Sequence, residues 1–349
     1  MTTQTGSASL TRFVVASRYM PVYIAFTLLI VIAAIWVPNA LSSVSISQVA
    51  PFGAVLAIAA LGQMLVVMTA GIDLSTPATL TLTMVIMTGV GLQSDERIGL
   101  AIAVALGVAA IIGLINGILI GGFKLNALIV TLAVGQVVIG VINRYGRTFP
   151  VQSQAPPGWI AWTSSRSFGI SNVFWVGLGL TLLLILGFRY TTLGRRFQAV
   201  GANPVASNVV GIRVNLNQIL VYVVAALFYA AAGTALAGLL RTPGVAVNNQ
   251  YLLGPIAAVV IGGASLTGGL ASAGSTFVAA IFLTGLNQLM RSMGLGTALQ
   301  FVVFGLVIIG GMLVSGDRII KVVERTLRER RRPGRAGKQT IDNSNDGPG

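Results

Sequence analysis

The sequence predicts an all-α protein that crosses a membrane about ten times. Its 349 residues are 55% hydrophobic and only 9% charged, whereas soluble domains carry about 25% charged residues. Apolar runs of roughly 20 residues, the length that a helix needs to cross a bilayer, recur along most of the chain. Polar residues gather between these runs, as expected when only the loops reach water.

The apolar runs divide the chain into one membrane domain with two tails. The ten predicted spans lie at about 20–37, 50–70, 76–92, 98–120, 126–143, 173–189, 217–240, 254–268, 270–290 and 298–315. Residues 1–19 form a predicted N-terminal tail, 20–316 the membrane domain, and 317–349 a basic, partly disordered tail. Charge followed by an apolar run also describes a signal peptide. The length of the first run favours a span that stays uncleaved.

The Lys and Arg residues predict the orientation. Ten spans place both termini on one side, and 16 of the 22 Lys and Arg residues fall on that side. Because basic loops remain in the cytoplasm, both termini and the polar loop 190–216 are expected there. The net charge of +14 is therefore explained by the membrane topology and does not indicate nucleic-acid binding. The basic tail is expected to contact anionic lipid. The opposite side receives the segment 144–172, whose prolines and tryptophans predict a compact loop or an interfacial helix.

Several residue types and motifs are missing. There is no Cys and no His, which excludes thiolate metal sites and removes the commonest general base. No phosphate-binding loop occurs, and no repeated series of intramembrane acidic residues of the kind that proton-coupled carriers use. The sequence therefore predicts a transport subunit without its own ATPase site, cofactor or metal, whose energy comes from a separate protein.

The loop 190–216 contains a short helix with both ends marked. Asn203 can cap the first turn with its side-chain oxygen, and Pro204 suits the first helical position. Gly211 can take the left-handed conformation that closes a helix. A capped helix on a basic cytoplasmic loop predicts a docking element for another protein, the alternative being an ordinary solvated loop.

Two polar breaks interrupt the spans, one in each half. The first holds Asp73, an acidic residue embedded between hydrophobic spans, just before a helix start at 75–77. It either caps that break or acts directly in a translocation path. The second is the glycine-rich stretch 262–269. Paired breaks in corresponding halves point to a transport pathway built from repeats, although close helix packing also uses glycine.

Polar residues near or within the spans are the candidates for lining a path. Each could bind a polyhydroxylated solute or bond to a neighbouring helix. The candidates are Gln63, Asp73, Ser75, Asn116, Asn126, Thr131, Gln136, Ser265 and Asn287. Gly113, Gly117 and Gly121 form a small-residue stripe that predicts helix packing and implies no chemistry.

Three stretches together resemble a known family. They are GIDLS at 71–75, GANPVASNVVGI at 201–212, and AAVVIGGASLTGG at 257–269. In this order and at these separations the chain resembles the permease subunits of bacterial ABC importers of the ribose, xylose and galactose type. The resemblance covers roughly 50–316 and implies the fold of a type II importer permease with pseudo-repeat halves.

The resemblance also implies partners and roles. It implies a bacterial inner-membrane protein that pairs with a second permease, expected to be an identical copy, with the path between them. A twin-cassette ATPase that binds ATP would dock below, and a periplasmic sugar-binding protein above. The helix 203–211 would be the coupling helix. The predicted coupling residues are Arg195, Arg196, Gly201, Asn203, Pro204, Ala206, Ser207, Gly211 and Ile212.

One departure from the family pattern and two alternatives remain. Many importers carry a Glu in this loop, whereas Pro204 and Val205 stand here, so docking is expected to rest on shape and on arginines, including Arg213. The same architecture serves permeases for branched-chain amino acids, nucleosides and autoinducers. A self-sufficient carrier or channel is the rival class, with Asp73 as its only candidate coupling residue; an intramembrane enzyme is disfavoured by the lack of Cys and His.

Overall fold

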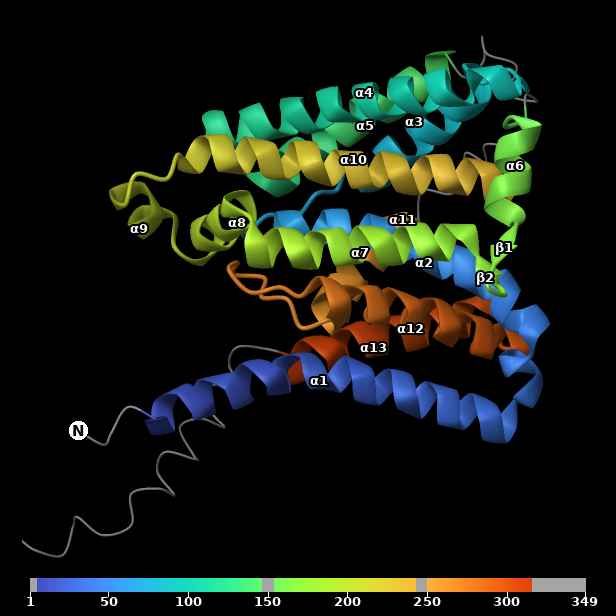
Figure 1. Cartoon of the computed structure of the whole chain (residues 1–349), viewed down its shortest axis with the longest axis horizontal. Helices are drawn as coiled ribbons and strands as arrows, with labels where there is room; N and C mark the ends of the chain where they lie inside the picture. Colours follow the sequence, from blue (N-terminus) through green and yellow to red (C-terminus); the bar gives the residue numbers. More distant parts are fainter. Residues whose placement is uncertain (1–4, 146–153, 243–249, 316–349) are drawn as a thin grey trace, which may run out of the picture.

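The computed structural model is a bundle of long helices that run roughly side by side (Figure 1). It describes residues 5–145, 154–242 and 250–315. The long helices are α1 (Thr5–Trp36), α2 (Ser43–Met68), α3 (Thr76–Gly89), α4 (Ile98–Gly117), α5 (Ala127–Tyr145), α7 (Asn172–Tyr190), α10 (Val214–Leu240), α11 (Gln250–Ile261), α12 (Ala273–Ser292) and α13 (Thr297–Ser315).

Short elements connect the long helices. They are the 3-10 helices η1 (Pro38–Leu41) and η2 (Asp95–Arg97), the π-helical turn η3 (Ile118–Gly122), and the helices α6 (Pro157–Ser164), α8 (Thr192–Ala202) and α9 (Pro204–Val209). The strands β1 (Arg166–Ser167) and β2 (Ile170–Ser171) form one antiparallel pair. Part of the predicted external segment is thus a short helix followed by a hairpin.

The predicted all-α membrane fold is confirmed. Among the described residues, seven helices are long and apolar enough to cross a bilayer, and two shorter apolar helices lie at Tyr251–Ile261 and Ala298–Gly311. Each of the ten predicted spans overlaps a helix. Helices of 12 and 14 residues, such as α11 and α3, are shorter than a bilayer needs, so the count of ten stays a prediction.

Some predicted boundaries differ from the helices. Helix α1 begins at Thr5, within the predicted N-terminal tail. The eighth predicted span extends to 268 and the ninth begins at 270, whereas residues 262–272 form a loop in the structure. The reason is the backbone of three glycines, Gly263, Gly268 and Gly269, which all have positive φ. A helix needs negative φ throughout, and hydropathy does not register this requirement. The predicted tail 317–349 lies outside the described residues.

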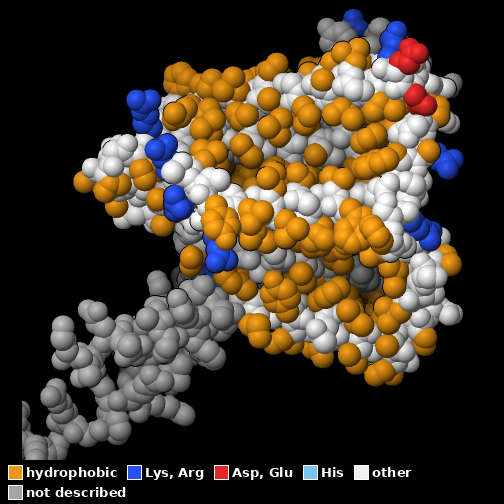
Figure 2. Space-filling view, viewed as in Figure 1, with side chains coloured by type: hydrophobic (Ala, Val, Ile, Leu, Met, Phe, Trp, Pro, Cys, Tyr) orange, Lys and Arg blue, Asp and Glu red, His pale blue; other side chains and the backbone are white. Residues whose placement is uncertain are grey.

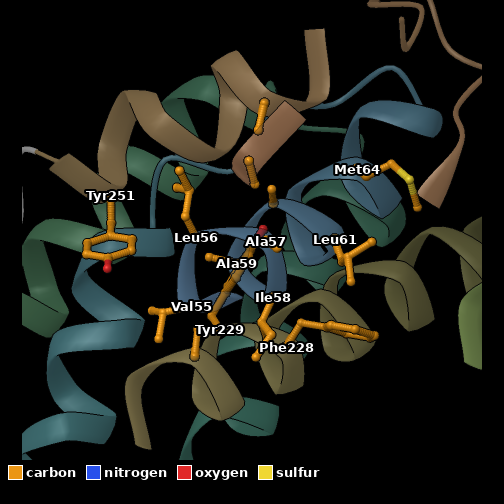
Figure 3. Close-up of a cluster of buried hydrophobic side chains, with 14 of the residues drawn as sticks. Val55, Leu56, Ala57, Ile58, Ala59, Leu61, Met64, Phe228, Tyr229 and Tyr251 are labelled. Carbon is orange, nitrogen blue, oxygen red and sulfur yellow. The ribbon is translucent and has the colours of Figure 1, made fainter. Parts of the chain in front are cut away.

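Helix α2 is the centre of the bundle. Its most apolar stretch is 94% buried, and it packs against α7, α10, α11 and α12. It is apolar on every side, which is the pattern of a fully surrounded helix. Figure 3 shows side chains of α2 meeting Phe228 and Tyr229 of α10. At Gly62 the packing leaves no space, because an added Cβ would lie 2.7 Å from the ring of Tyr229.

The predicted glycine stripe packs α4 onto α10. A Cβ on Gly113 would lie 2.5 Å from the carbonyl oxygen of Tyr222, and one on Gly117 would lie 2.8 Å from the Cα of Ile219. A Cβ on Gly121 would lie 3.0 Å from the carbonyl oxygen of Asn215. Small residues let membrane helices approach closely enough for backbone contact, and the predicted packing role of the stripe is confirmed.

The bundle has two distinct ends, which we name after the short helices that they carry. The α9 end holds α8, α9 and the start of α1, and the α6 end holds α6, η1, η2 and the hairpin (Figure 1). Basic side chains gather at both ends and leave an apolar band between them (Figure 2). The predicted cytoplasmic set contributes Lys124, Arg189, Arg195, Arg196 and Arg213 to the α9 end. The structure thus keeps these predicted cytoplasmic residues apart from the basic residues at the α6 end, as the charge count predicts.

Candidate functional site

The short helix α9 has the predicted caps. The side chain of Asn203 accepts a 3.0 Å hydrogen bond from the backbone N–H of Ala206, and Pro204 is the first helical residue. Gly211 follows with φ of +82°, and the next N–H, that of Ile212, donates to the carbonyl of Ser207 at 2.9 Å. Each end is therefore fixed by local bonds, as the sequence predicted.

The outer surface of α9 is apolar and highly exposed to solvent. Val205, Val209 and Val210 are 74%, 83% and 74% exposed. A groove of about 650 Å³ lies beside them and is lined by Lys124, Pro204, Val205, Asn208, Arg213, Val214, Asn215 and Leu216. Clustered apolar side chains beyond the end of the bundle are typical of surfaces that contact other proteins.

Positive charge surrounds this apolar surface. Arg195, Arg196 and Arg213 are exposed, and Lys124 donates from Nζ to the side chains of Asn215, at 2.5 Å, and Gln218, at 3.1 Å. Over the described stretches of the chain, the acidic residues at the surface are Asp95 and Glu96, and both lie at the α6 end. The α9 end therefore offers apolar contacts within a basic surround, which suits a partner surface with acidic groups.

Gly201, at the end of α8, touches the end of α2. A Cβ on Gly201 would overlap the carbonyl oxygen of Met68 and would lie 3.0 Å from the amide nitrogen of Gly269. That amide donates to the same Met68 carbonyl at 2.8 Å. Three backbone segments thus meet without intervening side chains, and we call the contact of Gly201, Met68 and Gly269 the glycine joint.

The first polar break, residues 69–75, begins directly at this joint. Ala70 has φ of +60°, and Gly71 donates to the carbonyl of Val66 at 3.1 Å, which closes α2. Asp73 then accepts from both the N–H and the hydroxyl of Ser75, at 2.8 and 2.6 Å. Helix α3 starts at the next residue. The interpretation of Asp73 as a group that stabilises the break agrees with these bonds.

Side chains from neighbouring helices complete a buried polar network. Asn116 of α4 donates from Nδ2 to the Ser75 hydroxyl at 2.9 Å, and the hydroxyl of Thr131 on α5 accepts from the N–H of Leu74 at 2.9 Å. Gln63 of α2 faces Thr76 and Tyr229. With its amide nitrogen turned toward the carbonyl of Asp73, Gln63 also donates there at 3.1 Å.

Five of the nine predicted path residues therefore meet in one cluster. Gln63, Asp73, Ser75, Asn116 and Thr131 are all at most 2% exposed. Buried polar groups of this kind are normally satisfied by each other, and here they bind the break to α2, α4 and α5. Their side chains are enclosed in this structure and do not face an open path.

The other four predicted path residues lie elsewhere. Asn126 caps α5 by accepting from the N–H of Leu128 at 2.9 Å, and Gln136 is exposed further along the same helix. Ser265 is buried in the second break, with its hydroxyl 2.8 Å from that of Thr267. Asn287 is half-buried on α12. Sequence alone did not separate these positions from the cluster.

Arg18 was missed as a structural residue. It is 7% exposed, and its Nε donates a 2.6 Å hydrogen bond to the carbonyl of Gly263. Gly263 and Ala264 close α11 through bonds to Val260 and Val259, so the guanidinium lies at the negative end of the α11 dipole. In the sequence, Arg18 contributes only to the charge count that predicts the topology. Its position just before an apolar run was the signal that could have indicated a structural role. Among the described residues, no group of His, Cys, Asp and Glu could hold a metal ion.

Comparison with known proteins gives the class to which this fold and site belong. The helical bundle with its exposed capped helix is that of a membrane permease subunit, and residues 45–312 match the family "Branched-chain amino acid transport system / permease component". The chain belongs to this family. No solved structure matches the chain.

Named relatives cover most of the chain. The ribose import permease protein RbsC of Escherichia coli is 31% identical over 302 residues, which are 84% of this chain and 92% of that protein. The fructose import permease protein FrcC of Rhizobium meliloti is 32% identical over 77% of this chain and 76% of its own length. The galactose/methyl galactoside import permease protein MglC of Salmonella typhimurium is 29% identical over 82% and 91%.

Proposed function

We propose that this chain is the permease subunit of an ABC importer for a monosaccharide. The observation that carries the proposal is the 31% identity to a ribose import permease over 84% of the chain. A fructose and a galactose import permease are 32% and 29% identical. A binding protein would deliver the sugar at the α6 end. ATP would be bound and hydrolysed by a separate ATPase at the α9 end, in the cytoplasm of a bacterium.

The surface of α9 supports a coupling role. Its exposed valines could enter a groove of the ATPase, and Arg195, Arg196 and Arg213 could meet acidic groups around that groove. The caps at Asn203 and Gly211 hold the helix as one piece. Gly201 and Ser207, both buried, attach it to the bundle. A short stiff helix can transmit a displacement that a flexible loop would absorb.

The exposed side of α5 supports a path at an interface. Gln136 lies well inside the helix and is exposed, yet an amide that faces hydrocarbon lacks hydrogen-bond partners and is costly. A second permease, or water in the path between two copies, would remove this cost. We therefore propose a homodimer whose path is lined by Gln136 and, at the mouth near the α9 end, by Asn126.

Reconstitution into proteoliposomes tests the function. The permease, its ATPase and its binding protein are incorporated together, and uptake of labelled ribose, fructose and galactose is measured with and without ATP. We expect uptake of at least one sugar only with ATP and all three components. Leucine serves as a further cargo in the same assay, since the family name includes branched-chain amino acids. Sugar uptake by the permease alone would instead show a self-sufficient carrier.

A further inference from the structure

We propose that motion of α9 reaches α5 along one continuous route, formed by the glycine joint and the polar network around Asp73. The inference rests on the proposed function, because it requires an ATPase that moves α9. It assigns Asp73 and Thr131 as positioning residues that act through other groups. Neither would touch the sugar.

The first part of the route links α9 to the end of α2. The N–H of Asn203 bonds to the carbonyl of Ala199 at 3.0 Å while its side chain caps α9, so α8 and α9 share one junction. Phe197 and Val200 of α8 are buried. Gly201 then meets the Met68 carbonyl with no side chain between them. Backbone contact of this kind has no rotamer that could absorb a displacement.

The second part links the end of α2 to α5. Residues 69–75 follow Met68 directly, and among the described residues they bond to the side chain of Thr131 on α5. Its hydroxyl accepts from the Leu74 N–H at 2.9 Å, and its single proton faces two carbonyl oxygens, that of Ala127 in its own helix at 2.8 Å and that of Ile72 at 3.3 Å. Asp73 sits between these two residues and fixes their backbone through its bonds to Ser75. A shift of the break would therefore pull on α5 at Thr131.

The third part lies within α5 itself. Thr131 is completely buried on the inner side of the helix, whereas Gln136, a little more than one turn further along, is exposed. A rigid helix transmits a displacement of its inner side to its outer side. The route thus begins at the proposed ATPase surface and ends at the proposed path.

Two substitutions of nearly equal shape isolate the bond at Thr131. Thr131→Val removes the hydroxyl and keeps the volume, and Thr131→Ser restores a hydroxyl. Thr181→Val is the matched control, since Thr181 is a buried threonine of α7 whose hydroxyl donates to Gly177 of its own helix at 2.7 Å and, within the described part of the chain, to no other helix. The complete importer is reconstituted with each variant. The readout is the number of sugar molecules imported per ATP hydrolysed, with the sugar that the wild type imports.

The expected result is uncoupling. Thr131→Val should lower the import-to-hydrolysis ratio about ten-fold, the size of a typical coupling energy between sites, while ATP hydrolysis and copurification with the ATPase persist. Thr131→Ser and Thr181→Val should keep the ratio within about two-fold of wild type. A Thr131→Val importer with the wild-type ratio would overturn the route and leave the proposed function intact. Failure of wild type and Thr181→Val to import with ATP would overturn both.

Asp73→Asn provides a second test of the same route. The amide oxygen can still accept both bonds from Ser75, so a positioning role predicts a ratio near that of wild type, while Asp73→Ala lowers it. Hydrolysis is again measured beside import, and the melting temperature of each variant shows whether it is folded. If Asp73→Asn lost import as completely as Asp73→Ala, the negative charge itself would be needed. The assignment of Asp73 as a positioning residue would then be wrong.

Discussion

The backbone N–H of Gly269 donates a 2.8 Å hydrogen bond to the carbonyl of Met68. Met68 is the last residue of α2, and Gly269 lies in the loop between α11 and α12. This bond joins the second polar break to the residue directly before the first one, so the two breaks that the sequence places in opposite halves of the chain are neighbours. Because Gly201 contacts both Met68 and Gly269, a movement of α8 would displace the two breaks together.

We expect Gly201→Ala to disrupt the glycine joint. The added methyl would overlap the Met68 carbonyl, so either α8 or the end of α2 must move, at a cost of about 1–3 kcal/mol. ATP-driven uptake should fall while the permease still copurifies with its ATPase. Gly187→Ala in α7 is the control, since a Cβ there meets nothing within 4 Å. Equal uptake by both variants would contradict the close contact.

Val209→Asp should weaken binding of the ATPase. Val209 is 83% exposed at the centre of the apolar surface of α9, and a carboxylate there would lose its water on docking. Binding is measured by copurification and by titration with purified ATPase, and we expect a loss of at least about ten-fold in affinity, near 1.4 kcal/mol. Phe168→Asp at the α6 end, also highly exposed, should leave binding unchanged. Equal loss in both variants would argue against docking at α9.

Arg18→Met should destabilise the bundle by about 2 kcal/mol. The reason is the loss of a hydrogen bond from a charged donor to a buried carbonyl, which contributes roughly 1.5–3 kcal/mol. The free energy of unfolding in detergent is the measurement. Arg189→Met serves as the control, because Arg189 is exposed and lies 5.4 Å from the ring centre of its neighbour Tyr190. A change as small as that of the control would show that Arg18 does not hold α11.

Asn203→Ala should loosen α9 without unfolding the protein. The cap that Asn203 gives to the N–H of Ala206 is worth about 1 kcal/mol, so amide exchange at Ala206 should quicken about five-fold. Asn203→Asp keeps an accepting oxygen and should exchange as slowly as wild type. Hydrogen exchange read by mass spectrometry over 203–212 gives both values. Exchange that stays slow in Asn203→Ala would mean that other contacts fix the helix.

Local signals in the sequence predicted local structure well. The caps of α9 follow from residue types at neighbouring positions, and so do the start of α3 after Ser75 and the packing of Gly113 and Gly117. Their physics acts within a few residues or along one helix face. The all-α membrane fold follows from composition for the same reason, since every apolar run must satisfy its own backbone in lipid.

Long-range contacts could not be predicted in the same way. The meeting of Met68, Gly201 and Gly269 joins three distant segments, and no periodicity in the chain encodes which glycines will touch. The polar residues show the limit most clearly. Hydropathy identifies Asn116 and Gln136 equally as polar groups within spans, yet one is buried in a network and the other is exposed. Only the helix rotation set by packing separates them.

The bond from Arg18 to Gly263 joins residues 245 positions apart, and this separation orders the biogenesis of the protein. Helix α1 packs on α12 and α13, which leave the ribosome long after it. Helix α1 therefore lacks these partners until the later helices have been synthesised. A chain cut before Gly263 should keep α1 undocked, and pulse-chase labelling should show that quality-control proteases remove it faster than the full-length protein.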